Sequence, residues 1–395
     1  MAENVHQLES SVIRSLRRLK DRYFPDKVTR HDLTPVEEPR KEEPEGFFDR
    51  LPVGLQFLIM TFLSPVDICC LGATSRYWRA MVRDPLLWRY RLLQDMPYWS
   101  SIDHLSMPHL ELLDAPLISE EESLDDREEG GEKEREWKLD YMSEYLKGCP
   151  SCRQQWLPPK PPYEVVTSFL QYLVPSSEPR YAMFGPGMEQ LDVSLVTRLM
   201  HAPDVLPVSG TPHRQINGIG SGISYMFNNQ HKFNILTLYS TNRAERERAR
   251  MQQQSTSNKL FTSEGTDESG YPVYSPASQV QQVCQVVDGF IYVANAESVG
   301  GDEKSEVAQI RAVLNCAGDS KSRPLLVLSC VSREQPETLG TTKCRTPCVY
   351  MAKRLCLPQL SNRWMVQDTV AESLSGLLDG VSWLLRCSGV KLYNS

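Results

Sequence analysis

The sequence predicts an α+β multidomain protein, in which a small all-helical region precedes a larger three-layer α/β domain. Residues 51–93 contain three closely spaced helix signatures with their own capping residues. From about residue 176, apolar strands alternate with amphipathic helices, as in a doubly wound and mostly parallel sheet. The length of 395 residues is enough for two or three such domains.

The first 46 residues predict one short helix and a linker. Val5, Leu8, Val12 and Leu16 recur at helical spacing, so residues 1–24 are expected to form an amphipathic helix. This helix is too small to be a domain. It can pair with a second copy in a homodimer, lie on a membrane surface or fray, and its small apolar bulk argues against the membrane. Residues 25–46 are rich in Pro, Glu and Lys and predict a disordered linker.

Residues 47–93 predict three short helices in succession. One apolar face of the first helix carries Leu51, Leu55, Leu58, Ile59 and Phe62. Ser64 and Ser75 are suited to cap the second and third helices, and Asp84-Pro85 ends the third. A unit of this size cannot cover its own aliphatic surface. We therefore expect that surface to meet a partner protein, or alternatively the rest of this chain.

This pattern closely resembles an F-box. The match includes Leu51-Pro52, the segment Phe62–Asp67 and the closing Asp84–Trp88, and Gly54 departs from an acidic residue that is usual in the family. The resemblance implies docking onto the S-phase kinase-associated adaptor of a cullin–RING (SCF) ubiquitin ligase, and through it to the cullin and RING subunits. It implies these adaptor-binding residues: Leu51, Pro52, Leu55, Ile59, Phe62, Leu63, Leu71, Trp78, Leu87 and Trp88.

Residues 94–175 predict a helical linker that contains an acidic loop at 119–136. Cys149 and Cys152 form a CxxC motif within this linker. Two cysteines are half of a zinc site, and a proline-rich stretch follows them instead of further ligands. The sequence therefore favours a loop with two free thiols over a zinc or redox site. The odd total of eleven scattered cysteines also favours reduced thiols over a disulfide framework.

Residues 176–388 predict the α/β domain. The expected strands are 181–184, 223–227, 233–239, 289–294, 324–329 and 364–366. The expected helices are 163–174, leading into the domain, then 191–200, 244–254, 280–287, 306–314, 348–357 and 371–385. The polar stretch 255–275 is expected to be mobile. The order of elements resembles the Ras/Arf small-GTPase fold, which implies a nucleotide-binding scaffold.

The nucleotide motifs of that fold are absent from the expected positions. A phosphate loop needs a second Gly, then Lys and Ser or Thr, because the lysine neutralises phosphate and the hydroxyl holds Mg²⁺. Counting from Gly185, these positions hold Gln190, Leu191 and Asp192. The later guanine-binding motifs are also missing. We therefore predict no nucleotide hydrolysis, no enzymatic activity, and no catalytic, cofactor-binding or metal-ligating residue.

Two surfaces of this domain are candidates for capturing a protein substrate. In the small-GTPase strand order, residues 222–228 form an edge strand that can take a partner strand by β-augmentation. The residues on it are Gly222, Ile223, Tyr225 and Phe227. The second surface comprises Arg345, Pro347, Cys348 and Ala352, where the small Cys348 and Ala352 allow a partner backbone to approach. Packing of these two residues against the domain's own sheet is the open alternative.

The segments EPRYAMFGPG, NNQHKFNIL, VCQVVDGFIYVANAE and RPLLVLSC resemble one member of the F-box family in particular. That resemblance implies two substrates, a telomeric-repeat-binding shelterin protein and a D-type cyclin. The net charge of −7 argues against broad nucleic-acid binding. We see no membrane-spanning run and no signal peptide, and therefore expect a cytoplasmic or nuclear protein. An F-box-fused regulatory GTPase and an adaptor-binding scaffold without a cullin are the competing interpretations.

Overall fold

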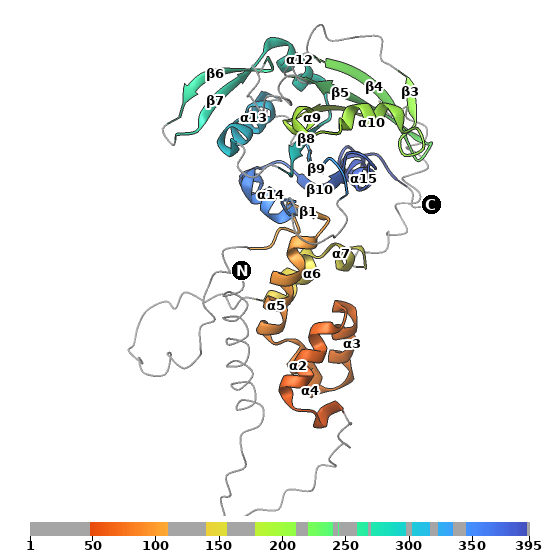
Figure 1. Ribbon diagram of the computed structural model, residues 1–395, viewed down its shortest axis with the longest axis vertical. Helices are drawn as coiled ribbons and strands as arrows, with labels where there is room; N and C mark the ends of the chain where they lie inside the picture. The colour runs from red at the N-terminus through yellow and green to blue at the C-terminus, as the bar shows by residue number, and fades with distance from the viewer. Residues whose placement is uncertain are drawn as a thin grey trace, which may run out of the picture. The chain divides into compact units, whose positions relative to one another are not determined.

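The computed structural model describes residues 48–109, 140–155, 178–210, 220–239, 244, 259–267, 270–297, 302–316, 323–334 and 345–392 (Figure 1). They fall into two compact units. Of the described residues, the first unit contains 48–95, 108–109 and 140–155, and the second contains 96–107 and those from 178 onward. The helices predicted at 1–24 and 163–174, the linker 25–46 and the acidic loop 119–136 lie outside the described residues, as does the helix 244–254 beyond Ala244.

The first unit is helical. Its elements are η1 (Phe48–Arg50), α2 (Val53–Phe62), α3 (Pro65–Thr74), α4 (Arg76–Val82), α5 (Pro85–Asp95), α6 (Tyr141–Gly148) and α7 (Pro150–Gln155). The predicted caps are present, since the Ser64 hydroxyl accepts from the Asp67 N–H and the Ser75 hydroxyl accepts from the Trp78 N–H. Asp84 Oδ1 accepts from the Leu86 N–H at 2.8 Å and so caps α5. Three short helices thus follow one another within residues 53–82, as predicted.

Two tryptophans form the core of this unit. Trp78 stacks on Phe48 with ring centroids 4.7 Å apart, and Trp88 lies 5.3 Å from the Tyr145 ring. The Trp88 indole N–H donates to the Val82 carbonyl at 2.6 Å, so this buried ring keeps its polar atom paired. Trp88 of α5 thus contacts α4 through this hydrogen bond and α6 through the Tyr145 ring.

The second unit is a mixed α/β domain built on an eight-stranded sheet. The strand order is β1-β10-β9-β8-β2-β5-β4-β3. The bounds are β1 (Ser101–Asp103), β2 (Arg180–Phe184), β3 (Val208–Gly210), β4 (Gly220–Phe227), β5 (His231–Leu238), β8 (Gly289–Asn295), β9 (Leu325–Val331) and β10 (Trp364–Val370). The five strands from β10 to β5 are parallel, while β1, β4 and β3 join by antiparallel pairing. Every residue of β8 and β9 is buried, as expected for central parallel strands.

Helices pack against this sheet, and a two-stranded hairpin lies beside it. The helices are α9 (Gly187–Gln190), α10 (Leu195–His201), α12 (Ser278–Val286), α13 (Glu303–Cys316), α14 (Cys348–Arg354) and α15 (Leu377–Cys387), with short 3₁₀ turns η2 (Met96–Tyr98) and η5 (Leu357–Gln359). α15 packs on β9 and β10, α14 on β10 and β1, and α12 on β2. The hairpin strands β6 (Phe261–Thr266) and β7 (Pro272–Pro276) pack on α13 through β7.

Four expectations need correction. Residues 101–103 were predicted to lie in a helical linker, but they form β1 and pair with β10. The stretch 255–275 is expected from its polar sequence to be mobile, but its described residues form most of the β6–β7 hairpin. β4 is not an edge strand, because β3 pairs with it at Tyr225 and Ser224. The last helix begins at Leu377 and not at 371, since Leu374 and Gly376 adopt positive φ angles that interrupt a helix.

None of the helices in the described ranges is long and apolar enough to cross a bilayer.

Candidate protein-docking surfaces

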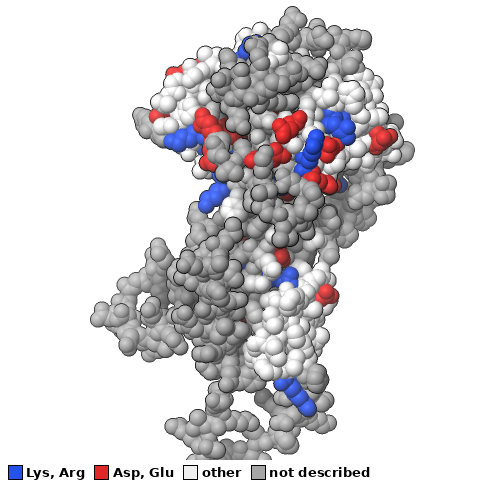
Figure 2. Space-filling view, in the orientation of Figure 1, with Lys and Arg blue, Asp and Glu red and all other residues white. Residues whose placement is uncertain are grey.

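An uncovered apolar ridge runs along α2. Leu55, Leu58 and Phe62 are 48%, 50% and 82% exposed, and their spacing puts them on one side of the helix. We call these three residues the α2 ridge. Figure 2 shows the described surface of the first unit to be largely uncharged on the face in view. Exposed aliphatic and aromatic side chains grouped on one helix are typical of a protein-docking surface.

The opposite side of α2 is held in place by buried polar contacts. Gln56 is fully buried, and its amide donates to the Phe48 carbonyl at 3.1 Å and accepts from the Tyr77 hydroxyl. Phe57 and Met60 fill the interior beside it. A buried amide needs such partners, because a buried polar group without a hydrogen bond destabilises the folded state by its full desolvation penalty. The ridge therefore sits on a helix whose rotation about its own axis is fixed.

Arg91 of α5 closes the carboxyl-terminal end of α2. Its Nη2 donates to the carbonyl oxygens of Met60 (3.2 Å) and Thr61 (3.1 Å), and also to that of Leu63. Asp95 lies 3.5 Å from the Arg91 guanidinium and accepts a 2.7 Å hydrogen bond from the Tyr145 hydroxyl. Burial and the contact with Asp95 raise the pKa of Tyr145, which therefore stays a donor. We refer to Arg91, Asp95 and Tyr145 as the Arg91 network.

The predicted adaptor-binding residues divide by exposure. Pro52, Leu55 and Phe62 are exposed, and Leu51, Ile59, Leu63 and Leu71 are partly exposed. Trp78, Leu87 and Trp88 are buried in the core of the first unit, so their assignment to a partner surface is wrong for this conformation. The prediction omitted Val66, which is 42% exposed at the start of α3, and Leu58, although Leu58 shares the helical spacing of Leu55.

The first candidate substrate surface is largely internal. β4 pairs with β5 along its whole length and with β3 at Tyr225 and Ser224. The side chains of Ile223, Tyr225 and Phe227 are buried, and Gly222 is buried as well. The exposed edge in this part of the described sheet belongs to β3, whose three residues are all exposed. The sequence missed β3 because a three-residue strand carries almost no periodic signal.

The second candidate surface is also internal at its two small residues. Cys348 and Ala352 are fully buried, so packing against the domain's own sheet is the correct alternative. The Cys348 thiol donates to Asp368 Oδ1 at 2.9 Å, and burial raises the pKa of this thiol. Arg345 Nη2 lies 2.9 Å from the same carboxylate and donates to the Ser329 carbonyl at 2.7 Å. Of the four residues predicted here, Arg345 and Pro347 keep partial exposure.

The side of α14 that faces solvent carries Tyr350, and not Cys348 or Ala352. Tyr350 is 45% exposed and was not predicted as a site residue. Its position between the buried Val349 and Met351 follows from the helical period, which turns adjacent residues by about 100°. A partner that approaches α14 in this conformation therefore meets Tyr350 before it meets Cys348 or Ala352.

The positions after the Gly185 turn, where a phosphate loop would bind nucleotide, are occupied by side chains that bond to or pack against this chain. Gln190 accepts a 3.2 Å hydrogen bond from the Asn295 amide, and Leu191 is 1% exposed. The Asp192 N–H donates to the Ser332 hydroxyl at 3.2 Å. These are the three positions that a phosphate loop would give to Gly, Lys and a hydroxyl residue. Within the described residues, no three His, Cys, Asp or Glu side chains are arranged to hold a metal ion.

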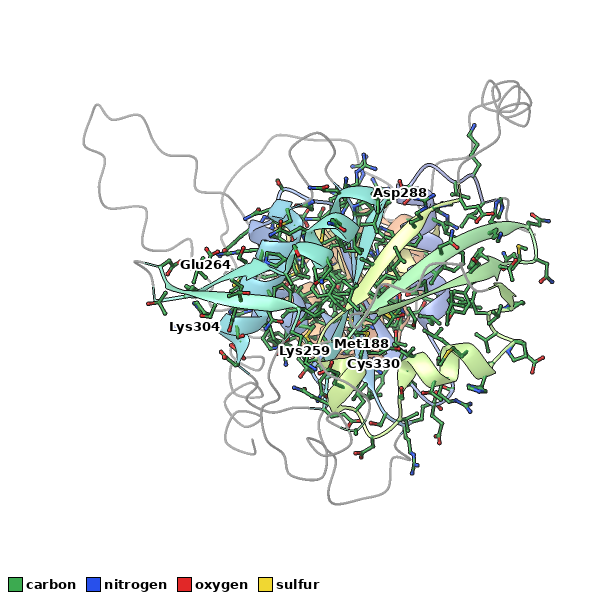
Figure 3. The ribbon with its side chains drawn as sticks, turned by 90° about the horizontal axis from the view of Figure 1, so that it is seen from above. Met188, Lys259, Glu264, Asp288, Lys304 and Cys330 are labelled. Carbon is green, nitrogen blue, oxygen red and sulfur yellow. The ribbon has the colours of Figure 1, made fainter. Side chains whose placement is uncertain are left out.

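The β6–β7 hairpin carries a further exposed group of side chains. The Lys304 ammonium lies 5.3 Å from the centre of the Tyr271 ring, a cation–π distance that ties α13 to the hairpin turn. Figure 3 shows Glu264 and Lys304 beside the hairpin, away from the central sheet. β6 is exposed from Thr262 onward, so this hairpin presents a polar face.

Comparisons with known proteins agree with the helical arrangement of the first unit. The F-box-like family matches residues 48–94. F-box only protein 4 of Mus musculus is 48% identical over 364 residues, covering 91% of this chain and 89% of the relative. The proteins of the same name from Bos taurus and Homo sapiens are 48% and 47% identical over 348 residues, covering 87% of this chain and 84% of each relative. The chain therefore belongs to the family of F-box only protein 4.

Proposed function

We propose that this protein is a non-catalytic substrate receptor of an SCF ubiquitin ligase. In this proposal the first unit docks on the S-phase kinase-associated adaptor, which connects it to the cullin and RING subunits. The second unit captures a protein for ubiquitination and degradation. The observation that carries the proposal is the α2 ridge, an uncovered apolar surface inside the segment that matches the F-box-like family.

The energetics favour a partner for this ridge. Removing apolar surface from water contributes about 25 cal/mol per Å² to binding, before the cost of lost translational, rotational and side-chain freedom is subtracted. Leu55, Leu58 and Phe62 each retain about half or more of their surface for such burial. The Arg91 network and the buried Gln56 keep α2 in one orientation, so little ordering is needed on binding. A fixed helix with one apolar face suits docking of a helix into a groove.

Strand order supports the proposal that the second unit is GTPase-like. β4, β5, β2, β8, β9 and β10 are adjacent in that order, with β4 antiparallel, while β3 and β1 extend the two edges. Gln190, Leu191 and Asp192 at the phosphate-loop positions favour a binding module over an enzyme. The competing proposal, an F-box-fused regulatory GTPase, predicts heat on titration with GTP and Mg²⁺, and we expect none.

For substrate capture we propose the exposed edge of β3 and the part of β4 that β3 does not pair, together with Arg345, Pro347 and Tyr350 around α14. An edge strand offers unpaired backbone groups to a partner strand. The proposed substrates remain a telomeric-repeat-binding shelterin protein and a D-type cyclin, encountered in the cytoplasm or nucleus. Val208→Pro in β3 should weaken substrate binding without affecting adaptor binding, because it removes a backbone donor.

The docking experiment uses the full chain and purified adaptor. Leu55→Asp combined with Phe62→Asp should reduce adaptor affinity by about 100-fold or more, because each carboxylate would be buried unpaired. Both positions are exposed in the free protein, so the fold should survive, and circular dichroism checks this. The matched control is Val286→Asp on α12, where the valine is 56% exposed. Equal adaptor binding by the double variant and the control would refute the proposal.

Adaptor binding alone does not distinguish a ligase subunit from a scaffold. Ubiquitination reconstituted with neddylated cullin, RING subunit, adaptor and each proposed substrate makes that distinction. We expect substrate modification with the unaltered chain and its loss with Leu55→Asp/Phe62→Asp. Adaptor binding without modification of either substrate would favour the scaffold interpretation.

A further inference from the structure

Two cysteines of the first unit are brought together by a tight turn. Cys149 directly precedes α7 and has an extended backbone, with φ −63° and ψ 120°. Cys152 is the third residue of α7, and its N–H donates to the Cys149 carbonyl at 3.1 Å. A side chain just before a helical turn points toward the third residue of that turn. The turn therefore places the two side chains one helical turn apart, and both cysteines are free thiols in the structure.

The surroundings of the two sulfurs differ. Burial raises the pKa of the Cys149 thiol, but hydrogen bonding by Ser151 and by Cys152 outweighs it and brings this pKa below its ordinary value. Ser151 Oγ lies 3.2 Å from Cys149 Sγ. Burial and the neighbouring Cys149 raise the pKa of Cys152 to about 12. This asymmetry is that of an attacking sulfur and a resolving sulfur in thiol–disulfide chemistry.

We propose that Cys149 and Cys152 are a modification site, a dithiol that hydrogen peroxide converts reversibly into a disulfide. A pair separated by one helical turn falls within the Cα separation that a disulfide requires, roughly 4.4–6.8 Å. Cys149 keeps 6% of its surface exposed, and peroxide is close to water in size. α7 has six residues, and local opening of so short a helix gives further access.

The chemistry balances in two steps. The Cys149 thiolate attacks one oxygen of hydrogen peroxide, so that an S–O bond forms, the O–O bond breaks, and the departing hydroxide takes a proton to become water. Cys152 sulfur then attacks the Cys149 sulfur, so that the S–S bond forms, the S–O bond breaks, and the hydroxide leaves with the Cys152 proton as a second water. The two thiols lose two electrons in total, and peroxide gains them.

Two alternatives for this cluster are less well supported. A zinc site would need further ligands, and the described residues contain no suitable group of three. Cys69 of α3 interacts electrostatically with Cys152, which makes a Cys69–Cys152 bridge the competing disulfide. Cys149 and Cys152 are joined by a single backbone-bonded turn, whereas Cys69 lies on a separate helix, so closure within the CxxC motif needs the smaller movement.

The experiment treats the full chain with increasing hydrogen peroxide, followed by differential alkylation and mass spectrometry. We expect the Cys149–Cys152 peptide to lose two hydrogens at lower peroxide than is needed to oxidise the exposed Cys70, and dithiothreitol to restore it. Cys152→Ser should leave a sulfenic acid on Cys149 that dimedone labels. Ser151→Ala, at an exposed position, should slow oxidation several-fold, because it removes a hydrogen bond to the Cys149 sulfur.

Two results would overturn the proposal: both cysteines staying alkylatable at peroxide levels that oxidise Cys70, or a disulfide that joins Cys152 to Cys69. The unaltered chain and Ser151→Ala suffice if a cysteine variant fails to fold. No adaptor or substrate enters this measurement, so its outcome is independent of the proposed ligase function.

Discussion

The Arg91 guanidinium donates a 3.2 Å hydrogen bond to the Met60 carbonyl, and so connects α5 to the end of α2 across 31 residues of sequence. The last four carbonyl groups of a helix have no partner within the helix. Arg91 is 7% exposed, and at this end of α2 its guanidinium donates the hydrogen bonds that water would otherwise donate to the helix carbonyls. Asp95, one turn further along α5, partly neutralises the buried charge. The position of the α2 ridge therefore depends on a side chain outside the ridge.

Replacing Arg91 by methionine should loosen the end of α2. Arg91→Met keeps an apolar stem but removes the Arg91 donor from the Thr61 carbonyl and leaves the Met60 carbonyl with the Leu63 N–H alone, which should cost about 2 kcal/mol. Amide hydrogen exchange measured over residues 53–62 should become faster. Arg79→Met is the control, because Arg79 is exposed on α4. Unchanged exchange in Arg91→Met would show that water can replace the guanidinium.

The turn after β2 should not tolerate a side chain. A Cβ at Gly185 would lie 2.5 Å from the Val293 carbonyl oxygen and 2.8 Å from its nitrogen, both backbone atoms that cannot move aside. Gly265 has nearly the same φ, +124° against +126°, but nothing within 4 Å of its Cβ position. Gly185→Ala should lower the melting temperature well below that of Gly265→Ala. Equal melting temperatures would mean that backbone strain alone decides the cost.

A charge at Ala352 should unfold the second unit and not merely block a partner. Ala352 is fully buried, and an unpaired carboxylate there should cost several kcal/mol. Tyr350→Asp lies on the same helix at a 45% exposed position and should leave the unit folded. Thermal unfolding followed by circular dichroism separates the two variants. A folded Ala352→Asp protein would indicate that α14 can move away from the sheet.

Local signals in the sequence predicted much of this fold. Ser64 and Ser75 cap helices at the expected residues because capping depends on the next three residues alone. The buried strands β8 and β9 were also predictable, since each contains a run of six apolar or small residues, rich in β-branched and aromatic side chains in β8, and a run this short favours a covered strand over a helix. Both kinds of signal can be read without knowing the rest of the chain.

Contacts between distant residues were not predictable in this way. β1 has three residues, and its partner for Ser101 is Gln367, far along the chain. On α2, apolar residues occupy both sides, so spacing could not decide that Met60 turns inward while Leu58 turns outward. Cys348 is buried where α14 packs on β10 and β1, and its thiol donates to Asp368, twenty residues later on β10. Each of these outcomes is set by tertiary packing, and the local pattern is compatible with either alternative.

The buried carboxyl of Asp368 should make stability depend on pH. Burial raises its pKa, and this outweighs the opposing effect of Arg345 and of the hydrogen bond from Cys348. A raised pKa in the folded state means that the folded protein binds the proton more tightly than the unfolded chain does. The stabilisation by neutral Asp368 is therefore complete below the ordinary pKa of about 4, and is lost as the pH rises through the raised value.

Asp368→Asn tests this, because asparagine has a similar size and cannot ionise. The melting temperature of the unaltered protein, relative to the variant, should fall as the pH rises from about 4 towards neutrality. Glu178→Gln serves as a control in which the pH dependence of stability should run in the opposite direction. The hydrogen bond from Lys232 lowers the pKa of Glu178, so its smaller, solvent-exposed contribution should be lost as the pH falls. A flat difference for Asp368→Asn would mean that Arg345 compensates the buried charge completely.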